Sequence, residues 1–119
     1  MTKVSPSILS ADFGNLERDI RAMVPAKADY VHVDVMDGLF VPNISLGQPV
    51  VASIRKVTEL PLDVHLMIDR PIRYVEQFCK AGADILTIHV EADTAENTRK
   101  ALEIIQGCGV TPAISIKPK

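Results

Sequence analysis

Short apolar segments alternate with amphipathic segments along the whole chain. In five segments aliphatic residues recur at every second position, which places them on one face of a β-strand. These predicted strands cover Val4–Leu9, Tyr30–Met36, Leu62–Met67, Asp84–Val90 and Thr111–Ile116. Four intervening segments have the apolar spacing of helices, and they cover Gly14–Val24, Pro49–Val57, Pro71–Ala81 and Ala95–Gln106. This order predicts a parallel sheet with helical crossovers.

The residues at the ends of these segments support the predicted boundaries. Asp93 followed by Glu96 has the spacing of a capping box at the start of the last helix. Gly82 and Gly107 lie where the third and fourth helices should end. No low-complexity segment or linker interrupts the pattern. We therefore expect residues 1–119 to belong to one domain without an internal boundary.

Each predicted strand has one aliphatic face and one mixed face. In the second strand His32, Asp34 and Met36 alternate with valines. Strands of an open parallel sheet are covered on both faces and are apolar throughout, and no GxGxxG turn follows the first strand. The pattern therefore favours a (β/α)8 TIM barrel whose polar face lines the interior. The other polar or mixed positions are Ser5, Ser7, Asp63, His65, Met67, Thr87, His89 and Ser115.

The number of predicted strands is too small for a complete barrel. Four strand–helix units and a fifth strand make about half of the eightfold pattern, which typically needs roughly 250 residues. We expect residues 1–119 to supply the N-terminal half, from the first to the fifth strand. Either the natural chain is longer, or half-barrels pair to close the sheet, and we expect a homo-oligomer.

Composition and charge exclude several classes of partner. The net charge of −2 and the aromatic content of 4% argue against nucleic-acid binding. No apolar run is long enough to cross a membrane, and the first ten residues lack the apolar core of a signal peptide. Cys79 and Cys108 lack CxxC spacing. We expect a cytoplasmic protein with reduced thiols and no membrane partner.

Three side chains of the mixed faces have the chemistry of metal ligands. His32 and Asp34 lie two residues apart on one strand, and His65 has the same phase on the next. Because neighbouring strands lie about 4.8 Å apart, these side chains can converge at the strand ends on one ion. Two imidazoles and a carboxylate suit a divalent metal such as zinc, iron or manganese.

Other residues of these faces allow two interpretations. Met36 and Met67 either pack in the core or form an apolar lid that keeps water from a reactive intermediate, and both roles are compatible. Ser7 is either a hydrogen-bond donor to a substrate or a small filler. His89 is interpreted as a core histidine or a support for the ligands. Asp37 is interpreted as a turn residue, although it could also support a ligand.

Several segments resemble, in order, the ribulose-phosphate 3-epimerase family. They are SPSILSADFGNL, YVHVDVMDGLFVPNISLG, DVHLMIDRP and AGAD, and the resemblance runs over essentially the whole chain. It implies that His32, Asp34 and His65 hold one divalent metal ion (zinc, iron, manganese or cobalt) together with an aspartate from the second half of the barrel. It also implies that Asp34 is one catalytic acid/base and that the later aspartate is the other.

The resemblance implies a small-molecule sugar phosphate as substrate. Ser7, His65, Met36 and Met67 would contact it, and glycine-rich loops late in the barrel would bind its phosphate. The implied reaction is the 3-epimerisation of D-ribulose 5-phosphate to D-xylulose 5-phosphate, in the pentose phosphate pathway or the Calvin cycle. A proton leaves and returns at C3 through a metal-stabilised enediolate, and no other cofactor is needed.

Three alternatives stay open. The first is an epimerase of the same group that acts on a hexulose phosphate such as allulose 6-phosphate. The second, a related decarboxylase or synthase, is disfavoured because its Asp-x-Lys-x-x-Asp pattern would need a lysine where this chain has Met36. The third is a half-barrel that binds a metal or a partner without catalysis. Without the second aspartate, we expect the 119-residue polypeptide alone to be inactive.

Overall fold

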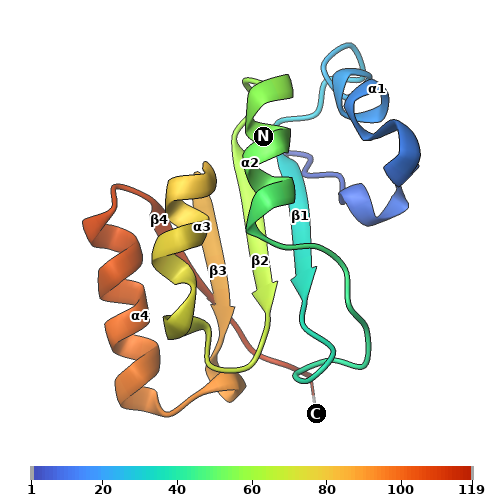
Figure 1. The fold of residues 1–119 in the computed structure, drawn as a ribbon. Helices are drawn as coiled ribbons and strands as arrows, with labels where there is room; N and C mark the ends of the chain where they lie inside the picture. The colour runs from blue at the N-terminus through green and yellow to red at the C-terminus, as the bar shows by residue number, and fades with distance from the viewer. Residues whose placement is uncertain (1, 119) are drawn as a thin grey trace.

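The computed structural model describes residues 2–118 of the chain. Four parallel strands form one sheet in the order β1-β2-β3-β4, and helices connect them (Figure 1). The strands are β1 (Val31–Met36), β2 (Leu62–Met67), β3 (Ile85–His89) and β4 (Thr111–Ser115). The helices are α1 (Leu16–Arg21), α2 (Gln48–Val57), α3 (Val75–Ala81) and α4 (Ala95–Gly107).

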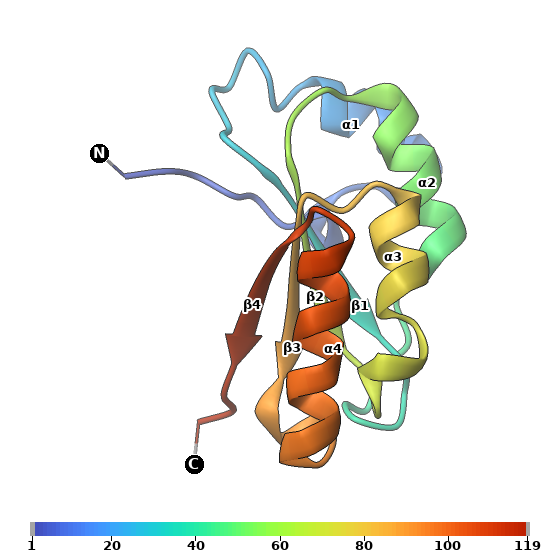
Figure 2. The same ribbon diagram turned by 90° about the vertical axis from the view of Figure 1, so that its left-hand side faces the viewer.

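The helices α2, α3 and α4 lie on one side of the sheet, and none of them covers its other face (Figure 2). Helix α2 contacts α3, and α3 contacts α4, so the helical layer follows the order of the strands. Consecutive strands with helical crossovers on one side are the arrangement of β/α units in a barrel. The α/β fold with a parallel sheet is thereby confirmed, and closure into an eight-stranded barrel stays a prediction.

The alternation predicted for β1 and β2 is confirmed by their burial. Every second residue of each strand is buried, and the intervening residues are only partly buried. The buried residues pack in the core beneath the helices, where burial stabilises the fold by about 1.5–3 kcal/mol for each large aliphatic side chain. They are Val31, Val33, Val35, Leu62, Val64 and Leu66. The partly buried residues are His32, Asp34, Met36, Asp63, His65 and Met67.

The last strand, β4, is partly exposed. Ile114 and Ile116 are predicted to pack toward the helices, and Ile114 does pair with buried Ile88. Ile114 is nevertheless 49% exposed and Ile116 is 74% exposed. The cause is that no helix after α4, within residues 2–118, covers the outer side of β4. The pairing with Ile88 nevertheless places Ile114 on the helical side of the sheet, as predicted, whereas Ile116 lies beyond the end of β4.

The first predicted strand, Val4–Leu9, is not a regular strand. Ser7 forms one isolated parallel bridge with His32, and a 3-10 helix begins immediately after it at Ile8. The backbone still runs beside β1, because the Pro6 carbonyl accepts a hydrogen bond from the His32 N–H at 3.0 Å. Pro6 has no N–H of its own to donate, which limits the ladder that this segment can form.

Two helices are shorter than predicted. The segment Gly14–Val24 contains α1 only from Leu16 to Arg21, preceded by a 3-10 helix over Phe13–Asn15. Likewise, a 3-10 turn over Pro71–Arg73 precedes α3. Among the helices of the described region, none combines the length and apolar character needed to cross a lipid bilayer.

The start of α4 is capped one residue later than predicted. Thr94, rather than Asp93, is the N-cap residue, and its hydroxyl accepts a hydrogen bond from the Asn97 N–H. Asp93 instead accepts hydrogen bonds from the Thr94 N–H and the Asn97 side-chain amide. Glu96 does not complete a capping box with Asp93, because its carboxylate pairs with Lys100 one turn further along.

The glycines predicted to end helices behave differently. Gly82 ends α3 with a φ of 123°, and a Cβ atom there would lie 2.6 Å from Cδ of Arg55. Only glycine therefore fits both the backbone conformation and the close approach. Gly107 remains the last residue of α4, and the chain reverses at Gly109 with a φ of 79°.

Candidate metal centre

The partly buried face of β1 and β2 brings four titratable side chains side by side. The strand register pairs His32 with Asp63 and Asp34 with His65. Because paired residues of parallel strands share a face, all four side chains lie on the face opposite the helices. His32 is the second residue of its strand, and Asp34 and His65 are the fourth of theirs. The cluster therefore lies along the middle of the strands and not, as predicted, at their ends.

Three of these side chains converge on one point. Oδ1 of Asp34 lies 2.8 Å from Nε2 of His32 and 3.2 Å from Nδ1 of His65. One ligand atom from each residue lies within 4.8 Å of the other two. Donors about 2.0–2.2 Å from a zinc ion lie roughly 3 Å from one another. The donor atoms and their spacing therefore fit a divalent metal ion.

Neighbouring side chains form hydrogen bonds with the outer nitrogen of His32 and the outer oxygen of Asp34. Nδ1 of His32 lies 2.8 Å from Oδ2 of Asp63, and the Ser5 hydroxyl donates to the same oxygen at 3.0 Å. The Ser7 hydroxyl donates to Oδ2 of Asp34 at 2.7 Å. A carboxylate on the outer nitrogen of a ligating histidine fixes its tautomer and ring orientation. Asp63 thus directs Nε2 of His32 toward the point of convergence.

The electrostatics of the cluster keep its carboxylates ionised. The hydrogen bond with Asp63 raises the pKa of His32 and lowers the pKa of Asp63. Burial acts to raise the pKa of Asp34, but the Ser7 hydrogen bond and the adjacent His32 outweigh burial and lower it. Burial lowers the pKa of His65 and favours its neutral form. Ionised carboxylates and a neutral His65 are the forms that bind metals, whereas the raised pKa of His32 means that a metal ion competes there with a proton.

The structure places the other predicted residues around this cluster. Met36 and Met67 are register partners at the last positions of β1 and β2, two residues beyond Asp34 and His65. Both methionines are partly buried, so they lie beside the cluster on the same face. Ser7 reaches the cluster through its hydrogen bond to Asp34, and its contact with a substrate stays a prediction.

Asp37 is a turn residue, as the sequence predicts. Its Oδ1 atom accepts hydrogen bonds from the N–H groups of Leu39 and Phe40, at 2.9 and 2.8 Å. Its Oδ2 atom accepts from the N–H group of Asp69 at 2.7 Å. The carboxylate therefore joins the loop after β1 to the loop after β2.

Two residues of the site were not predicted. Asp63 was assigned only to the mixed face, although Asp63-x-His65 repeats on β2 the two-residue spacing of His32-x-Asp34 on β1. Ser45 lies in the irregular segment after β1, where no periodicity points to it. Its hydroxyl donates to the Asp34 carbonyl at 2.7 Å and accepts from the Met36 N–H at 2.9 Å. Ser45 thus fixes the backbone on either side of Val35.

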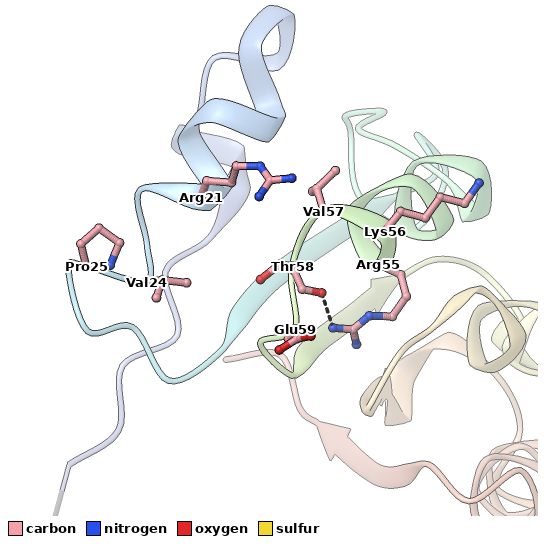
Figure 3. Close-up of a pocket in the computed structure, with 8 residues that line it drawn as sticks. All are labelled: Arg21, Val24, Pro25, Arg55, Lys56, Val57, Thr58 and Glu59. Carbon is pink, nitrogen blue, oxygen red and sulfur yellow. Dashed lines mark hydrogen bonds between the residues drawn. The ribbon is translucent and has the colours of Figure 1, made fainter.

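A hollow on the surface lies away from this cluster. A cavity of about 730 Å³ lies between the ends of α1 and α2, beside the segment that precedes β2 (Figure 3). Its central cation, Arg55, donates to the Thr58 carbonyl at 2.9 Å and to Oδ2 of Asp84 at 2.7 Å. Arg21 pairs with Glu17 at 2.9 Å. Arg55 thus joins the end of α2 to the segment before β3, whereas Arg21 pairs within α1, and we assign no chemistry to the hollow.

Cys79 does not supply a reactive nucleophile. Cys79 and Cys108 are free thiols. Burial, together with the adjacent Cys108, raises the pKa of the Cys79 thiol to about 12. The thiolate is the nucleophilic form of cysteine, so Cys79 is unreactive at neutral pH.

Comparison with known proteins identifies the family of this chain. Residues 3–119 match the family described as ribulose-phosphate 3 epimerase. Ribulose-phosphate 3-epimerase of Bacillus subtilis (strain 168) is 49% identical over 118 residues, which are 99% of this chain and 54% of the relative. The enzyme of the same name from Synechocystis is 50% identical over 115 residues, covering 97% of this chain and 50% of the relative. The chain therefore spans about half the length of the curated relatives it matches.

A solved structure shares the fold. The crystal structure of 7,8-dihydropteroate synthase from Vibrio fischeri ES114 superposes with a TM-score of 0.68 at 14% sequence identity. The superposition covers 99% of this chain and 45% of the other. At this level of identity the likeness concerns the fold alone.

Proposed function

Because this chain belongs to the ribulose-phosphate 3-epimerase family, we propose that it carries the metal-binding part of an enzyme that epimerises D-ribulose 5-phosphate to D-xylulose 5-phosphate. One observation carries this proposal beyond the family match. His32, Asp34 and His65 bring two imidazole nitrogens and a carboxylate oxygen within 4.8 Å of one another. This grouping offers ligands for a metal ion and an ionised base, and both would assist proton transfer beside a ketone.

The proposed framework is a closed (β/α)8 barrel in which residues 1–119 form the N-terminal part of one domain. The order of the strands and the single helical layer support it. Within residues 2–118, the helices α2, α3 and α4 leave the polar face of β1 and β2 uncovered, which is the condition expected of a face that lines a barrel interior. The relatives are about twice as long as this chain, and their remaining length could supply the other strands.

The proposed cofactor is one divalent ion of zinc, iron, manganese or cobalt, held by His32, Asp34 and His65. A bound ion would supply positive charge beside the oxygen of the substrate ketone, where negative charge develops. The Asp63 carboxylate on Nδ1 of His32 supports this assignment, since it orients that ring as a ligand.

Asp34 is proposed to remove the proton from C3. Its lowered pKa keeps the carboxylate ionised at neutral pH. Oδ1 of Asp34 faces the two imidazoles, so Oδ2 is the atom proposed to accept the proton. The Ser7 hydroxyl, which donates to Oδ2 at 2.7 Å, would orient the carboxylate and lie within reach of the substrate.

The return of the proton to C3 and the exclusion of water require further residues. Epimerisation returns the proton on the opposite face of C3, which requires a second acid. That acid is proposed to be an aspartate in the part of the relatives' length that this chain does not span. Met36 and Met67 are proposed to pack against the reacting carbons and exclude water from them.

The test is to follow D-ribulose 5-phosphate by NMR in heavy water with the natural protein that contains this chain. The proposal predicts conversion to D-xylulose 5-phosphate with deuterium at C3, loss of conversion after treatment with a strong chelator, and recovery when a divalent metal is added. Turnover of allulose 6-phosphate without turnover of ribulose 5-phosphate would contradict the assigned substrate. Full activity in metal-free protein would contradict the metal site.

A further inference from the structure

A third histidine lies directly behind the proposed ligand His65. His89 is the last residue of β3 and is only 7% exposed. Its Nε2 atom lies 2.7 Å from Nε2 of His65. The two rings are nearly parallel, at 22°, with their centroids 4.8 Å apart. Because the nitrogens are much closer than the centroids, the rings meet edge to edge, and the distance is that of an N–H···N hydrogen bond.

The direction of this hydrogen bond follows from the ligand role of His65. Nδ1 of His65 faces Oδ1 of Asp34 within the ligand set. A nitrogen that binds a metal must offer its lone pair, and a neutral imidazole carries a proton on the other nitrogen. His65 must therefore donate from Nε2, and Nε2 of His89 must accept.

We propose that His89 is a positioning residue for the metal site, because its Nε2 atom holds His65 in the tautomer that turns the Nδ1 lone pair toward the ion. The inference rests on the metal site of the proposed function and deepens it. It gives His65 the kind of outer support that Asp63 gives His32. Both ligand histidines then have a fixed tautomer, each held by a residue of a different strand.

Glu91 and Phe40 lie next to the His89 ring. As an acceptor at Nε2, neutral His89 carries its proton on Nδ1, and this buried nitrogen has no hydrogen-bond partner in the described region. Oε1 of Glu91 lies 3.5 Å from it. Phe40 packs against the His89 ring, with centroids 5.2 Å apart.

A matched pair of variants separates this role from simple packing. His89→Gln keeps an acceptor near the position of Nε2, whereas His89→Leu fills similar space without one. The zinc affinity of the metal-stripped natural protein is measured by competition with a chromophoric chelator. We expect His89→Leu to weaken zinc binding by about 10–100-fold, the usual effect of losing an outer partner of a ligand. The glutamine variant should retain most of the affinity.

The outcomes separate this inference from the proposed function. If the wild-type protein binds no zinc, the metal site itself is wrong, and the role of His89 is wrong with it. If the wild-type protein binds zinc and His89→Leu binds it equally well, only the role of His89 is refuted. Weaker binding by the glutamine variant than by the leucine variant would also refute it, since packing would then dominate.

A spectroscopic measurement on the wild-type protein needs no variant to fold. In zinc-loaded protein labelled with ¹⁵N-histidine, long-range ¹H–¹⁵N correlation should show the ring proton of His65 on Nε2 and that of His89 on Nδ1. A proton on Nε2 of His89 would overturn the proposal.

Discussion

Asp63→Asn is the substitution that most directly tests how the metal site is organised. Asp63 would not itself bind the ion, because its Oδ2 atom lies 2.8 Å from the outer nitrogen of His32 and accepts a second hydrogen bond from Ser5. Asparagine has nearly the same shape but no charge. The substitution therefore weakens the support of one ligand and leaves all three proposed ligands in place.

The size of the effect follows from the hydrogen bond that changes. Hydrogen bonds to charged groups contribute about 1.5–3 kcal/mol, and those between neutral groups contribute about 0.5–1.5 kcal/mol. The loss of charge at Asp63 should therefore cost roughly 1–1.5 kcal/mol, or about tenfold in metal affinity. The Asp63 side chain is 21% exposed, so water screens it slightly and favours the lower end of this range.

The assay is zinc competition with a chromophoric chelator on the natural protein at neutral pH. The matched control is Asp69→Asn, which removes the same charge from an aspartate that pairs with the exposed Arg70 at 2.9 Å. The control should change zinc affinity by less than about twofold, as exposed ion pairs contribute little. Equal affinities in wild type and Asp63→Asn would refute the idea that Asp63 orients His32.

Three further predictions concern the base, the methionines and a turn. Asp34→Asn should abolish epimerisation while the circular dichroism spectrum stays native, because it removes the base and a charged ligand; activity within about tenfold of wild type would show that Asp34 has neither role. Met36→Leu and Met67→Leu should each cost less than about 1.5 kcal/mol of stability and little activity, and a loss of several orders of magnitude in turnover would implicate the sulfur. Burial acts to raise the pKa of Asp37, but three backbone N–H groups outweigh it and lower that pKa. Its stabilisation is therefore present above the unfolded pKa of about 3.9 and is lost as the pH falls through the folded value. Urea unfolding should show Asp37→Asn destabilised by about 1–2 kcal/mol at neutral pH and by less in acid; a difference that grows in acid would contradict this assignment.

The elements of the fold were predictable where periodicity and burial agree. Strand β2 has the predicted bounds, and α2 begins one residue before the predicted start. In both, a complete apolar face packs in the core. The first segment failed because its apolar pattern resembles a strand, while Pro6 and the turn at Ile8 leave it one isolated bridge. The pairing of a strand with its neighbour is a property of the whole sheet, which a local pattern does not contain.

The same distinction holds for the site. The convergence of His32, Asp34 and His65 was predictable, because strand period and parallel pairing place them on one face. The contact of Asp63 with His32 and that of His89 with His65 depend on register and on ring rotation. Neither is fixed by the spacing of residues along one strand. The supporting roles of Asp63 and His89 therefore depend on side-chain positions that only the structure provides.

Anomalous diffraction from crystals of the natural protein grown with zinc or manganese tests the central claim most directly. Data collected above and below the absorption edge of the metal locate the ion and identify it. We predict one anomalous peak, which marks an ion bound by Nε2 of His32, Nδ1 of His65 and a carboxylate oxygen of Asp34. For zinc the metal–ligand distances should be about 2.0–2.2 Å. An ion bound by other residues, or no peak among these three side chains at saturating metal, would contradict it.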